Sequence, residues 1–386
     1  MKSEWKTIRA ADFMEFNPRM NLKKGTIATK ISMDKLQPYV KKIPETEQAE
    51  FSGGTKFSNG DTIMARITPC LENGKTAFVD CLNKDEVAFG STEFIVLRAK
   101  PGVSDAQFVY YLATSPEFRQ VAIKSMVGSS GRQRVQQPVL ENLEFVVPEL
   151  PEQKRIGEFL AAIDDKIALN AKINDNLLQQ AQALYKDRFV DLNPFDGEMP
   201  PDWRLGTVSE IIELHDSKRI PLSSRERANL AKIYPYYGAT SVMDYVDRYL
   251  FDGIYLLLGE DGTVVDSKGF PILQYVEGKF WVNNHAHIIT GKNGFTVETL
   301  YLLFSLTNVQ SIVTGAVQPK ISQANLNKVS VVIPSEAELS DFNSIVQPIF
   351  AQIRNLRAEN DRLAATRDTL LPRLMSGKLD VSSVDL

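Results

Sequence analysis

Three charged residues in the second half of the chain are of the types that metal-dependent nucleases use. Asp266, Glu277 and Lys279 follow the order D…E-x-K, in which two carboxylates would hold a divalent cation beside a phosphate. A pattern this short recurs by chance, and Glu277–Lys279 is more typical of a hairpin turn between two β-like runs. We therefore expect a turn here and no nuclease site.

Two histidines are the nearest approach to a metal-binding pattern. His285 and His287 flank Ala286 on a probable strand, where alternate side chains face the same side. A zinc site would need a third and a fourth ligand, which the neighbouring sequence does not offer. We expect a polar core or a base contact here, and no metal.

Methyl transfer to a DNA base would also require recognisable motifs. The chain has no N/D-P-P-Y/F motif and no F-x-G-x-G loop, and the segments FSGGT and MPPD do not fit them. We therefore expect the chain to have no catalytic residues of its own.

Two glycine-containing loops combine the residue types that read nucleic acids. Residues 128–137 carry Arg132, Gln133 and Arg134, and residues 315–320 carry Gln318 and Lys320. Arginine reaches guanine edges, glutamine reaches adenine edges, and lysine holds phosphates. A solvated surface loop is the alternative, but recurrence at the same place in both halves of the chain favours a functional contact.

Two long stretches follow these loops and must position them. In residues 148–189 apolar residues recur at alternating steps of four and three, the heptad spacing of a helix packed along another helix. A second stretch with this spacing begins near residue 342, and we expect the two to pair. The candidate pairing residues are Ile163, Ile167, Asn174 and Leu177 in the first stretch, and Ile349, Ile353, Asn360 and Leu363 in the second.

The chain is an internal duplication. Phe342 lies 186 residues after Ile156 (342 − 156 = 186), and the other seam positions keep this offset. Upstream of both helices, residues 134–148 align with residues 320–334, which pairs Pro148 with Pro334. Two amphipathic helices could match by chance, but a shared strand-like ending with its proline should not.

Asparagines interrupt both apolar seams, at Asn170, Asn174 and Asn360. A buried amide pair lowers stability but penalises slipped pairings, so we interpret these residues as a register device. If the helices run antiparallel, equivalent positions meet only near the middle, where Asn174 and Asn360 are equivalent.

The ends of the helices also have sequence signals. Pro151 suits the first turn of the first helix, and Ser335 with Glu338 forms an S-x-x-E capping box for the second. Pro348 lies inside the second seam and lacks an N–H, so we expect a break near Gln347. The second helix should end between residues 372 and 377.

The remaining segments predict two α+β modules. In the first, β-like runs at residues 60–67, 74–80 and 91–99 precede a single helix for which Ser104 is the expected N-cap. The second repeats that order without close identity. The predicted division is a first module at residues 1–148, a first spacer helix at 149–192, a second module at 193–335, and a second spacer helix with tail at 336–386.

The composition is that of an ordinary globular protein, with 386 residues of which 43% are hydrophobic and 24% charged. No signal-peptide pattern follows Met1, and no apolar run approaches the ~18 residues of a membrane span. Cys70 and Cys81 lack metal-ligand spacing and suit a reducing compartment, so we expect a cytoplasmic protein.

The two modules differ in charge. Residues 1–148 have a net charge of +3 (20 − 17), and residues 193–335 have a net charge of −3 (12 − 15). A protein that held DNA alone would normally be more basic. If this chain binds DNA, a partner is expected to supply much of the positive charge.

Two variable modules, each followed by a long helix, with LPEQKRIGEFLAAIDDKI after the first and RDTLLPRLMSGKL closing the second, resemble the specificity (S) subunit of type I restriction-modification systems. The resemblance covers essentially the whole chain and is most specific in the helices. It implies two target recognition domains, each reading half of a split, asymmetric DNA target. The helices would form an antiparallel coiled coil that spaces the domains and docks two methyltransferase (M) subunits, which restriction (R) subunits then join. It also implies that S-adenosylmethionine, ATP and Mg²⁺ are used by those partners and that this chain binds no cofactor.

In this interpretation the DNA-contacting candidates are polar residues of the two modules. They are Arg66, Lys75, Arg132, Gln133 and Arg134 in the first module, and Lys218, Arg219, Asn283, Asn284, His285, Gln318 and Lys320 in the second. The alternative is a non-enzymatic coiled-coil adaptor whose modules bind protein partners. Salt-dependent binding to a DNA duplex would separate the two hypotheses.

Overall fold

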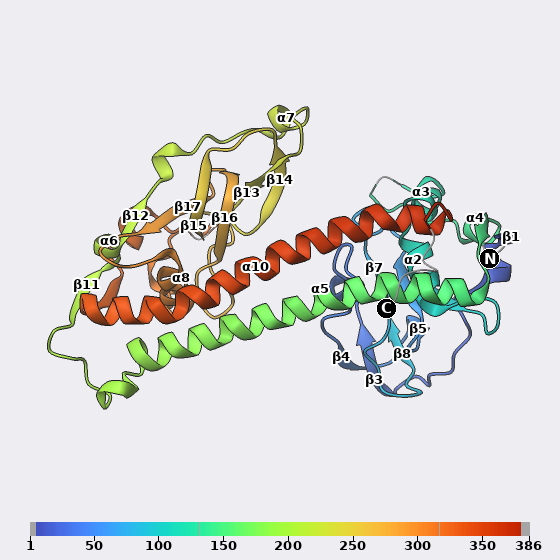
Figure 1. Cartoon of the computed structure of the whole chain (residues 1–386), viewed down its shortest axis with the longest axis horizontal. Helices are drawn as coiled ribbons and strands as arrows, with labels where there is room; N and C mark the ends of the chain where they lie inside the picture. Colours follow the sequence, from blue (N-terminus) through green and yellow to red (C-terminus); the bar gives the residue numbers. More distant parts are fainter. Residues whose placement is uncertain (1–4, 130, 316, 380–386) are drawn as a thin grey trace. The chain divides into compact units, whose positions relative to one another are not determined.

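The computed structural model describes residues 5–129, 131–315 and 317–379, and it divides into two compact units (Figure 1). The first unit contains Met1–Ala171 and Arg357–Leu386, and the second contains Lys172–Leu356. Each unit therefore combines one β-rich domain with part of each long helix. The predicted α+β fold class is confirmed.

The first unit contains three small sheets and four short helices. The strand orders are β2-β9-β6-β7, β4-β3-β8-β5 and β1-β10. The bounds are β1 Lys6–Arg9, α1 Ala10–Phe13, β2 Met14–Phe16, β3 Ile27–Ile31, β4 Glu47–Glu50, β5 Thr55–Phe57, β6 Thr62–Ala65, β7 Thr76–Phe78, β8 Ala88–Gly90, β9 Phe94–Ala99, α2 Ala106–Thr114, α3 Pro116–Lys124, α4 Gln137–Glu141 and β10 Glu144–Val147.

The second unit replaces the two four-stranded sheets with a single larger one. Its six-stranded sheet has the order β12-β17-β15-β16-β13-β14, and β11 pairs with β18. The bounds are β11 Arg204–Thr207, α6 Val208–Ile211, β12 Ile212–Leu214, α7 Ser224–Arg227, β13 Tyr234–Tyr237, β14 Val242–Val246, β15 Phe251–Gly259, β16 Leu273–Val282, β17 Ala286–Gly291, α8 Val297–Ser305, α9 Gln323–Leu326 and β18 Ser330–Ile333.

The two units share one frame, as the internal duplication predicts. β1 pairs antiparallel with β10, Lys6 opposite Val147, and β11 pairs antiparallel with β18, Arg204 opposite Ile333. α4 and β10 begin 186 residues before α9 and β18 (323 − 137 and 330 − 144). The repeat is therefore structural and extends well beyond the helices.

Two long helices follow the two domains: α5 (Leu150–Tyr185) and α10 (Glu336–Met375). The predicted break near Gln347 is wrong, because α10 is continuous through Pro348. Pro348 is exposed, so water can satisfy the carbonyl left without a donor on that face. The predicted end is confirmed, since the helix stops at Met375. Within the described residues, no helix is both long and apolar enough to span a membrane.

The helices pair antiparallel within each unit. In the first unit Asn170 of α5 donates to Asn360 of α10 at 2.9 Å, and Asn360 donates to the carbonyl of Ile167 at 3.1 Å. In the second unit the Tyr185 and Phe342 rings lie edge to face at 5.7 Å. These contacts place increasing residue numbers of one helix opposite decreasing numbers of the other.

The buried amide pair is Asn170 with Asn360, so the α5 residue is one helical turn before the predicted Asn174. The partner of Asn360 is Asn170, which is fully buried, whereas Asn174 was expected. The Oδ1 atom of Asn174 is buried and has no hydrogen-bond partner among the described residues. The seam pattern repeats along each helix, so it predicts which faces pair but not which residues lie opposite each other. The other predicted pairing residues, from Ile163 to Leu363, are half-buried, except Ile353, which is buried.

Each domain is fixed to its part of the helix pair by one apolar core. In the first unit Ile156 and Leu160 of α5 and Leu374 of α10 join the domain core around Phe108. In the second unit Ala181 and Tyr185 of α5 and Phe342, Val346 and Phe350 of α10 do the same. Ile156, Leu160, Ala181, Phe342, Val346 and Leu374 are seam residues that the 4-3 spacing identified, whereas Tyr185 and Phe350 are not, and the seam residue Leu184 is exposed.

Three local predictions are corrected. The N-cap of α2 is Asp105, which accepts from Phe108 N–H, while the Ser104 hydroxyl donates to the carbonyl of Phe13. The single helix expected there is two, because Ser115 caps a new helix before Pro116. The expected turn at Glu277–Lys279 is the middle of β16, which pairs with β15.

Candidate nucleic-acid interface

The first predicted loop is fastened to the end of β6 by backbone hydrogen bonds. They are Thr68 N–H to Gln133 O at 3.0 Å, Val135 N–H to Arg66 O at 2.9 Å and Arg134 N–H to Val127 O at 2.9 Å. The loop is thus a short hairpin whose base is held by the strand end below it. Its residue Ser130 lies outside the described residues.

The second predicted loop is fastened in the same way to the end of β15. The corresponding bonds are Gly262 N–H to Pro319 O at 3.0 Å, Ile321 N–H to Glu260 O at 2.9 Å and Lys320 N–H to Thr314 O at 2.7 Å. The acceptor and donor positions in the loops keep the 186-residue offset (319 − 133 and 321 − 135). Ala316 in this loop lies outside the described residues.

A glycine is required at the start of each loop. Gly128 and Gly315 have φ angles of 139° and 88°, and a Cβ atom there would lie 2.8 Å from Arg132 O and 2.3 Å from Gln318 O. Both the left-handed conformation and the close backbone approach therefore favour glycine. Each domain thus presents a defined loop at an equivalent place.

The first loop carries one unpaired arginine and one paired arginine. Arg132 is exposed and has no ion-pair partner among the described residues. The guanidinium of Arg134 contacts both oxygens of Glu93, with the shortest distance 2.6 Å. Hydrogen bonding to Arg134 holds the pKa of Glu93 below its usual range. Arg132 is therefore the better candidate for a base contact, and Arg134 also braces the loop.

Two other candidates of the first domain have internal partners. The Arg66 guanidinium is half-buried and donates to Val135 O at 3.4 Å. The Lys75 ammonium donates to Met33 O at 2.9 Å. Gln133 is half-buried, and no partner of its side chain is found among the described residues. The predicted roles of Arg66 and Lys75 in DNA contact therefore have a structural alternative.

The second loop has an exposed glutamine and a paired lysine. Gln318 is exposed, and the Lys320 ammonium lies 3.1 Å from Glu260 Oε1. Glu260 also accepts from Arg219 at 2.6 Å, and the Arg219 side chain is only 14% exposed. Lys218 beside it is exposed. Gln318 and Lys218 are the side chains of this region best placed to reach a ligand.

The asparagine–histidine segment divides into buried and exposed parts. Asn283 is 3% exposed, and its side chain contacts Met243 Sδ and the backbone N–H of His285, which argues against the predicted DNA contact. Asn284 is exposed. His285 is half-buried, and its Nδ1 contacts Asp261. Asn283 therefore shapes the segment from inside.

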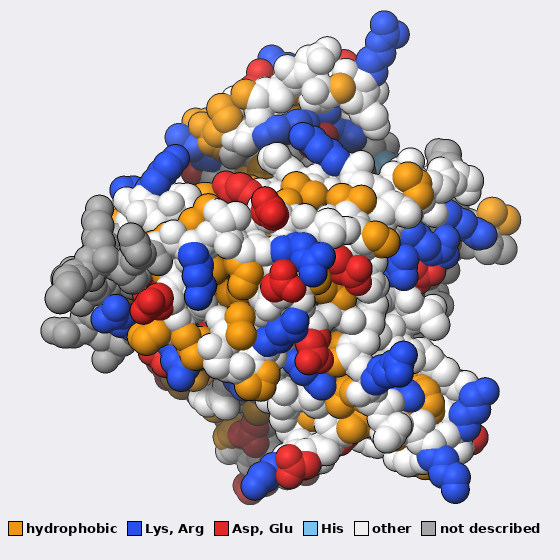
Figure 2. Space-filling view, turned by 90° about the vertical axis from the view of Figure 1, so that its right-hand side faces the viewer, with side chains coloured by type: hydrophobic (Ala, Val, Ile, Leu, Met, Phe, Trp, Pro, Cys, Tyr) orange, Lys and Arg blue, Asp and Glu red, His pale blue; other side chains and the backbone are white. Residues whose placement is uncertain are grey.

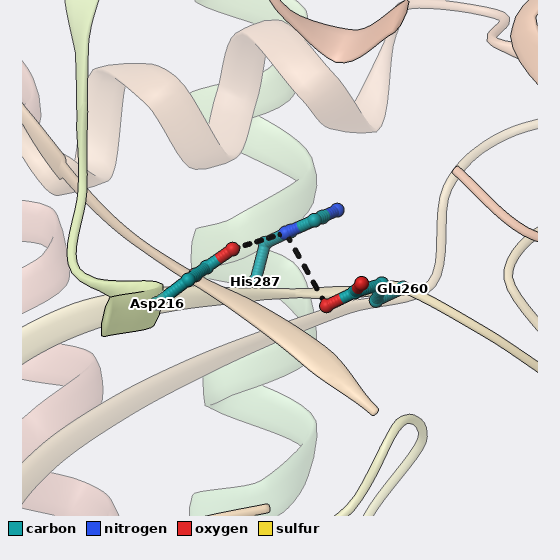
Figure 3. A group of neighbouring side chains, drawn as sticks. All are labelled: Asp216, Glu260 and His287. Carbon is teal, nitrogen blue, oxygen red and sulfur yellow. Dashed lines mark hydrogen bonds and ion pairs between the residues drawn. The ribbon is translucent and has the colours of Figure 1, made fainter. Parts of the chain in front are cut away.

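Behind the second loop three ionisable side chains converge, from η4 (Asp216–Lys218), the end of β15 and β17 (Figure 3). His287 Nδ1 lies 2.6 Å from Asp216 Oδ2 and 3.7 Å from Glu260 Oε2. We call Asp216, Glu260 and His287 the hub. Its ligand atoms lie within 4.8 Å of one another. However, protein cations already contact both carboxylates, since Arg219 and Lys320 contact Glu260 and Arg219 also lies 3.5 Å from Asp216. The donor set is that of an ion-pair network.

The carboxylates of the hub are held ionised. Burial alone would raise the pKa of Asp216, but hydrogen bonds from His287 and from the N–H of Ile288 outweigh it and lower the pKa. Burial likewise opposes ionisation of Glu260, and Arg219 and His287 lower its pKa. The hub thus keeps two negative charges buried beside Arg219, Lys320 and the His287 ring.

Asp216, Glu260 and Glu93 were not among the predicted residues. Glu93 contacts Arg134, Asp216 contacts His287, and Glu260 contacts Arg219, His287 and Lys320, at separations of 27 to 71 positions that no local pattern reports. The alternation of His285 and His287 was a usable signal, because it marked a polar strand end. On the face shown in Figure 2, Lys and Arg side chains are interspersed with Asp and Glu, so charge does not mark a binding patch on that face.

The duplicated frame and the paired loops define a protein with two separate binding domains on one helix pair. The chain belongs to the family of type I restriction modification DNA specificity domains, whose model matches residues 2–179 and 200–364. Its predicted resemblance is thereby confirmed.

Individual relatives carry the same description. The chain is 24% identical over 307 residues to the type I restriction enzyme MjaIX specificity subunit of Methanocaldococcus jannaschii, covering 72% of this chain and 70% of that protein. It is 22% identical over 404 residues to the HindI specificity subunit of Haemophilus influenzae, covering 84% and 87%.

A solved structure shares the fold. The crystal structure of the type I restriction-modification system S subunit from M. genitalium matches with a TM-score of 0.55 and 18% identity, covering 97% of this chain and 96% of that one. Because the chain belongs to the family of DNA specificity domains, we refer to the two β-rich domains as the first and second recognition domains.

Proposed function

We propose that this chain is the non-catalytic, sequence-reading subunit of a type I restriction-modification complex. Each recognition domain reads one half of a split DNA target in double-stranded DNA through the loop described above. The observation that carries this proposal is that the two domains repeat the same loop framework but present different side chains. A duplicated frame with unlike loops suits a target whose halves are unlike.

The catalytic work belongs to partners in this proposal. Two M subunits dock on the helix pair and use S-adenosylmethionine, and R subunits use ATP and Mg²⁺. The partners also supply positive charge that the acidic second domain lacks, since phosphate contacts dominate the affinity of proteins for DNA. We place the complex in the cytoplasm, where its DNA substrate lies.

Methylome sequencing tests the proposal directly. A host free of related methylation would express this chain with its cognate M subunit, and each alone as controls. We expect methylation in one bipartite, asymmetric motif only when both are present. Methylation by the M subunit alone in the same motif, or by this chain alone, would contradict the proposal.

The adaptor alternative makes a different prediction. If the domains bind proteins only, the assembled complex will not shift a duplex carrying the motif. In the proposed function the shift occurs and weakens steeply with salt, because bound counterions are released. A salt-independent shift, or none, would favour the adaptor.

A further inference from the structure

A buried backbone carbonyl lies behind each loop and must find a donor. In the first unit it is Val135 O, and in the second it is Ile321 O; the two residues have equivalent backbone hydrogen bonds and the 186-residue offset. Arg66 donates to Val135 O at 3.4 Å, whereas His287 Nε2 contacts Ile321 O at 2.8 Å. The domains therefore satisfy the same carbonyl with different residues.

The hydrogen bonds of His287 fix its protonation state. A carbonyl oxygen offers only lone pairs, so Nε2 must carry a hydrogen to bond Ile321 O. Asp216 is an ionised carboxylate that also accepts from the N–H of Ile288 at 2.9 Å, so Nδ1 must carry a hydrogen too. A ring with hydrogens on both nitrogens is an imidazolium. His287 is fully buried and is therefore a buried cation.

The first unit has a neutral version of the same arrangement. Strand pairing puts Ile95 at the place of His287, since Met64 is opposite Ile95 in β6–β9 and Leu258 is opposite His287 in β15–β17. The role of Asp216 belongs there to Asn17. Its Oδ1 accepts from the N–H of Val96 at 2.9 Å, and its amide group donates to Gln137 at 2.7 Å. In the second unit Gln323, the counterpart of Gln137, donates to Asp216 at 2.5 Å.

The second unit thus exchanges an amide and an aliphatic side chain for a carboxylate and an imidazolium. The other charged groups facing His287 are Glu260, with Arg219 and Lys320 beyond it. Lys320 and Ile321 close the loop that carries Gln318, and both contact the hub. The charge of His287 is therefore tied to the loop base by two routes, Ile321 O and the Glu260–Lys320 pair.

We propose that the His287 imidazolium is the positioning residue of the second recognition loop. It holds the loop base by donating to Ile321 O while Asp216 balances its charge. It thus supplies the hydrogen bond that Arg66 supplies to the equivalent carbonyl in the first domain. The proposal rests on the proposed function for what the loop reads, but the state of the ring is independent of it.

Histidine NMR tests the ring directly. The chain has three histidines, so ¹⁵N-histidine labelling gives a small set of ring signals that His215→Gln and His285→Gln variants assign. We expect His287 to show two protonated ring nitrogens at neutral pH in the free, full-length chain. A single protonated nitrogen would overturn the proposal.

Two variants separate positioning from stability. His287→Ile removes the donor and leaves Asp216 buried with only Arg219, 3.5 Å away, as its cation, so both folding and sequence discrimination should suffer. The D216N/H287I variant recreates the amide and aliphatic pair of the first domain and should recover the unfolding midpoint. It should not recover sequence discrimination at the half-site, because Ile321 O still lacks a donor.

Reading is measured with the assembled complex and duplexes that carry single changes in either half of the methylome-derived motif. We expect both variants to lose about tenfold in discrimination at the half-site read by the second domain. Discrimination at the other half-site is the internal control and should stay within about twofold. Full discrimination by the D216N/H287I variant, or equal loss at both half-sites, would overturn the proposal. A wild-type complex that selects no sequence would instead refute the proposed function, with the NMR result intact.

Discussion

The first recognition domain supports its loop with Arg66 from the strand end below, whereas the second has Glu260 at that place and takes its donor from His287. The backbone hydrogen bonds of the two loops are otherwise the same. The shared backbone hydrogen bonds therefore fix the position of each loop. The side chain at the end of the supporting strand can be positive, as Arg66 is, or negative, as Glu260 is. The residues of a loop that contact DNA can therefore vary without any change in the hydrogen bonds that hold the loop.

The domains also differ in how they are anchored to the helices. In the first unit a buried polar chain crosses the junction: Tyr111 donates to Asp164 of α5 at 2.6 Å, and Arg367 of α10 donates to Asp164 at 2.6 Å. In the second unit Arg354 of α10 donates to Glu298 of α8 at 3.0 Å, and Tyr275 donates to Glu298 at 2.7 Å. An aromatic cluster of Tyr185, Phe189 and Phe342 lies at the same junction, with ring centroids 4.8 to 5.7 Å apart. Both junctions thus pair a buried carboxylate with an arginine of α10, but the carboxylate belongs to the long helix α5 in the first junction and to the domain in the second.

The largest expected effect follows from that contrast. Asp164→Ala leaves Arg367 and Tyr111 without their acceptor in a junction where Asp164 is 5% exposed. Removing one partner of a buried pair costs about 3–5 kcal/mol, so we expect a loss of that size in unfolding free energy. Urea denaturation measures it, and hydrogen exchange should show the loss in the first unit.

The neighbouring Asp165→Asn variant is the matched control. Asp165 pairs with Lys42 but is 57% exposed, so its replacement should change stability by about 0.5 kcal/mol or less. Equal losses in the two variants would show that the junction does not rely on the Asp164 charge.

A smaller effect concerns the loop tips. Arg132→Ala should reduce discrimination at one half-site by roughly ten- to hundredfold, because one bidentate base contact is lost, and Gln318→Ala should act at the other half-site. Arg134→Ala should also affect the first half-site, by releasing the loop from Glu93. Competition binding with half-site variants measures each effect. If either tip variant alters both half-sites equally, the loops are general phosphate contacts.

Most of the frame was predictable from the sequence because it depends on periodicity. The 4-3 spacing identified both helices, and the 186-residue offset identified the duplication. The break predicted at Pro348 was wrong because the spacing does not show which face of the helix is exposed to solvent. The error at Asn174 arose because a repeating apolar pattern fits several registers of the two helices, and the residues alone do not choose among them.

Much less of the site was predictable. The loops stood out by composition, but the partners that decide which side chains are available lie elsewhere in the chain. Asp216, Glu260 and His287 are brought together only by sheet pairing between β15 and β17 and by the segment after β12. Asn283 was named as a base contact because its type suits one, and only burial shows its internal role.

The smallest expected effect is a pH dependence of stability that arises from Lys41 at the first junction. Lys41 is 2% exposed; its ammonium lies 3.3 Å from the Tyr111 hydroxyl and 5.1 to 5.7 Å from the rings of Phe78, Tyr110 and Tyr111. Burial lowers its pKa to about 8, although the Asp164 and Asp165 carboxylates act in the opposite direction.

The sign of the effect follows from proton counting. Between pH 8 and the unfolded lysine value of about 10.5, the unfolded chain binds more protons at Lys41 than the folded chain, so stability rises with pH. Below pH 8 the folded chain carries the full penalty of a buried ammonium. Burial raises the pKa of Tyr110 and Tyr111, so the stability that these two tyrosines contribute falls only above about pH 10.

Lys41→Met removes the titrating group while keeping most of its apolar contacts. From pH 8 to pH 9.5 the wild type should gain about 1–2 kcal/mol of unfolding free energy relative to this variant. Urea denaturation at steps of half a pH unit measures the difference, and hydrogen exchange should assign the gain to the first unit. Parallel pH profiles for the two proteins would mean that Lys41 titrates normally, and the charge-based account of this junction would then be limited to Asp164 and Arg367.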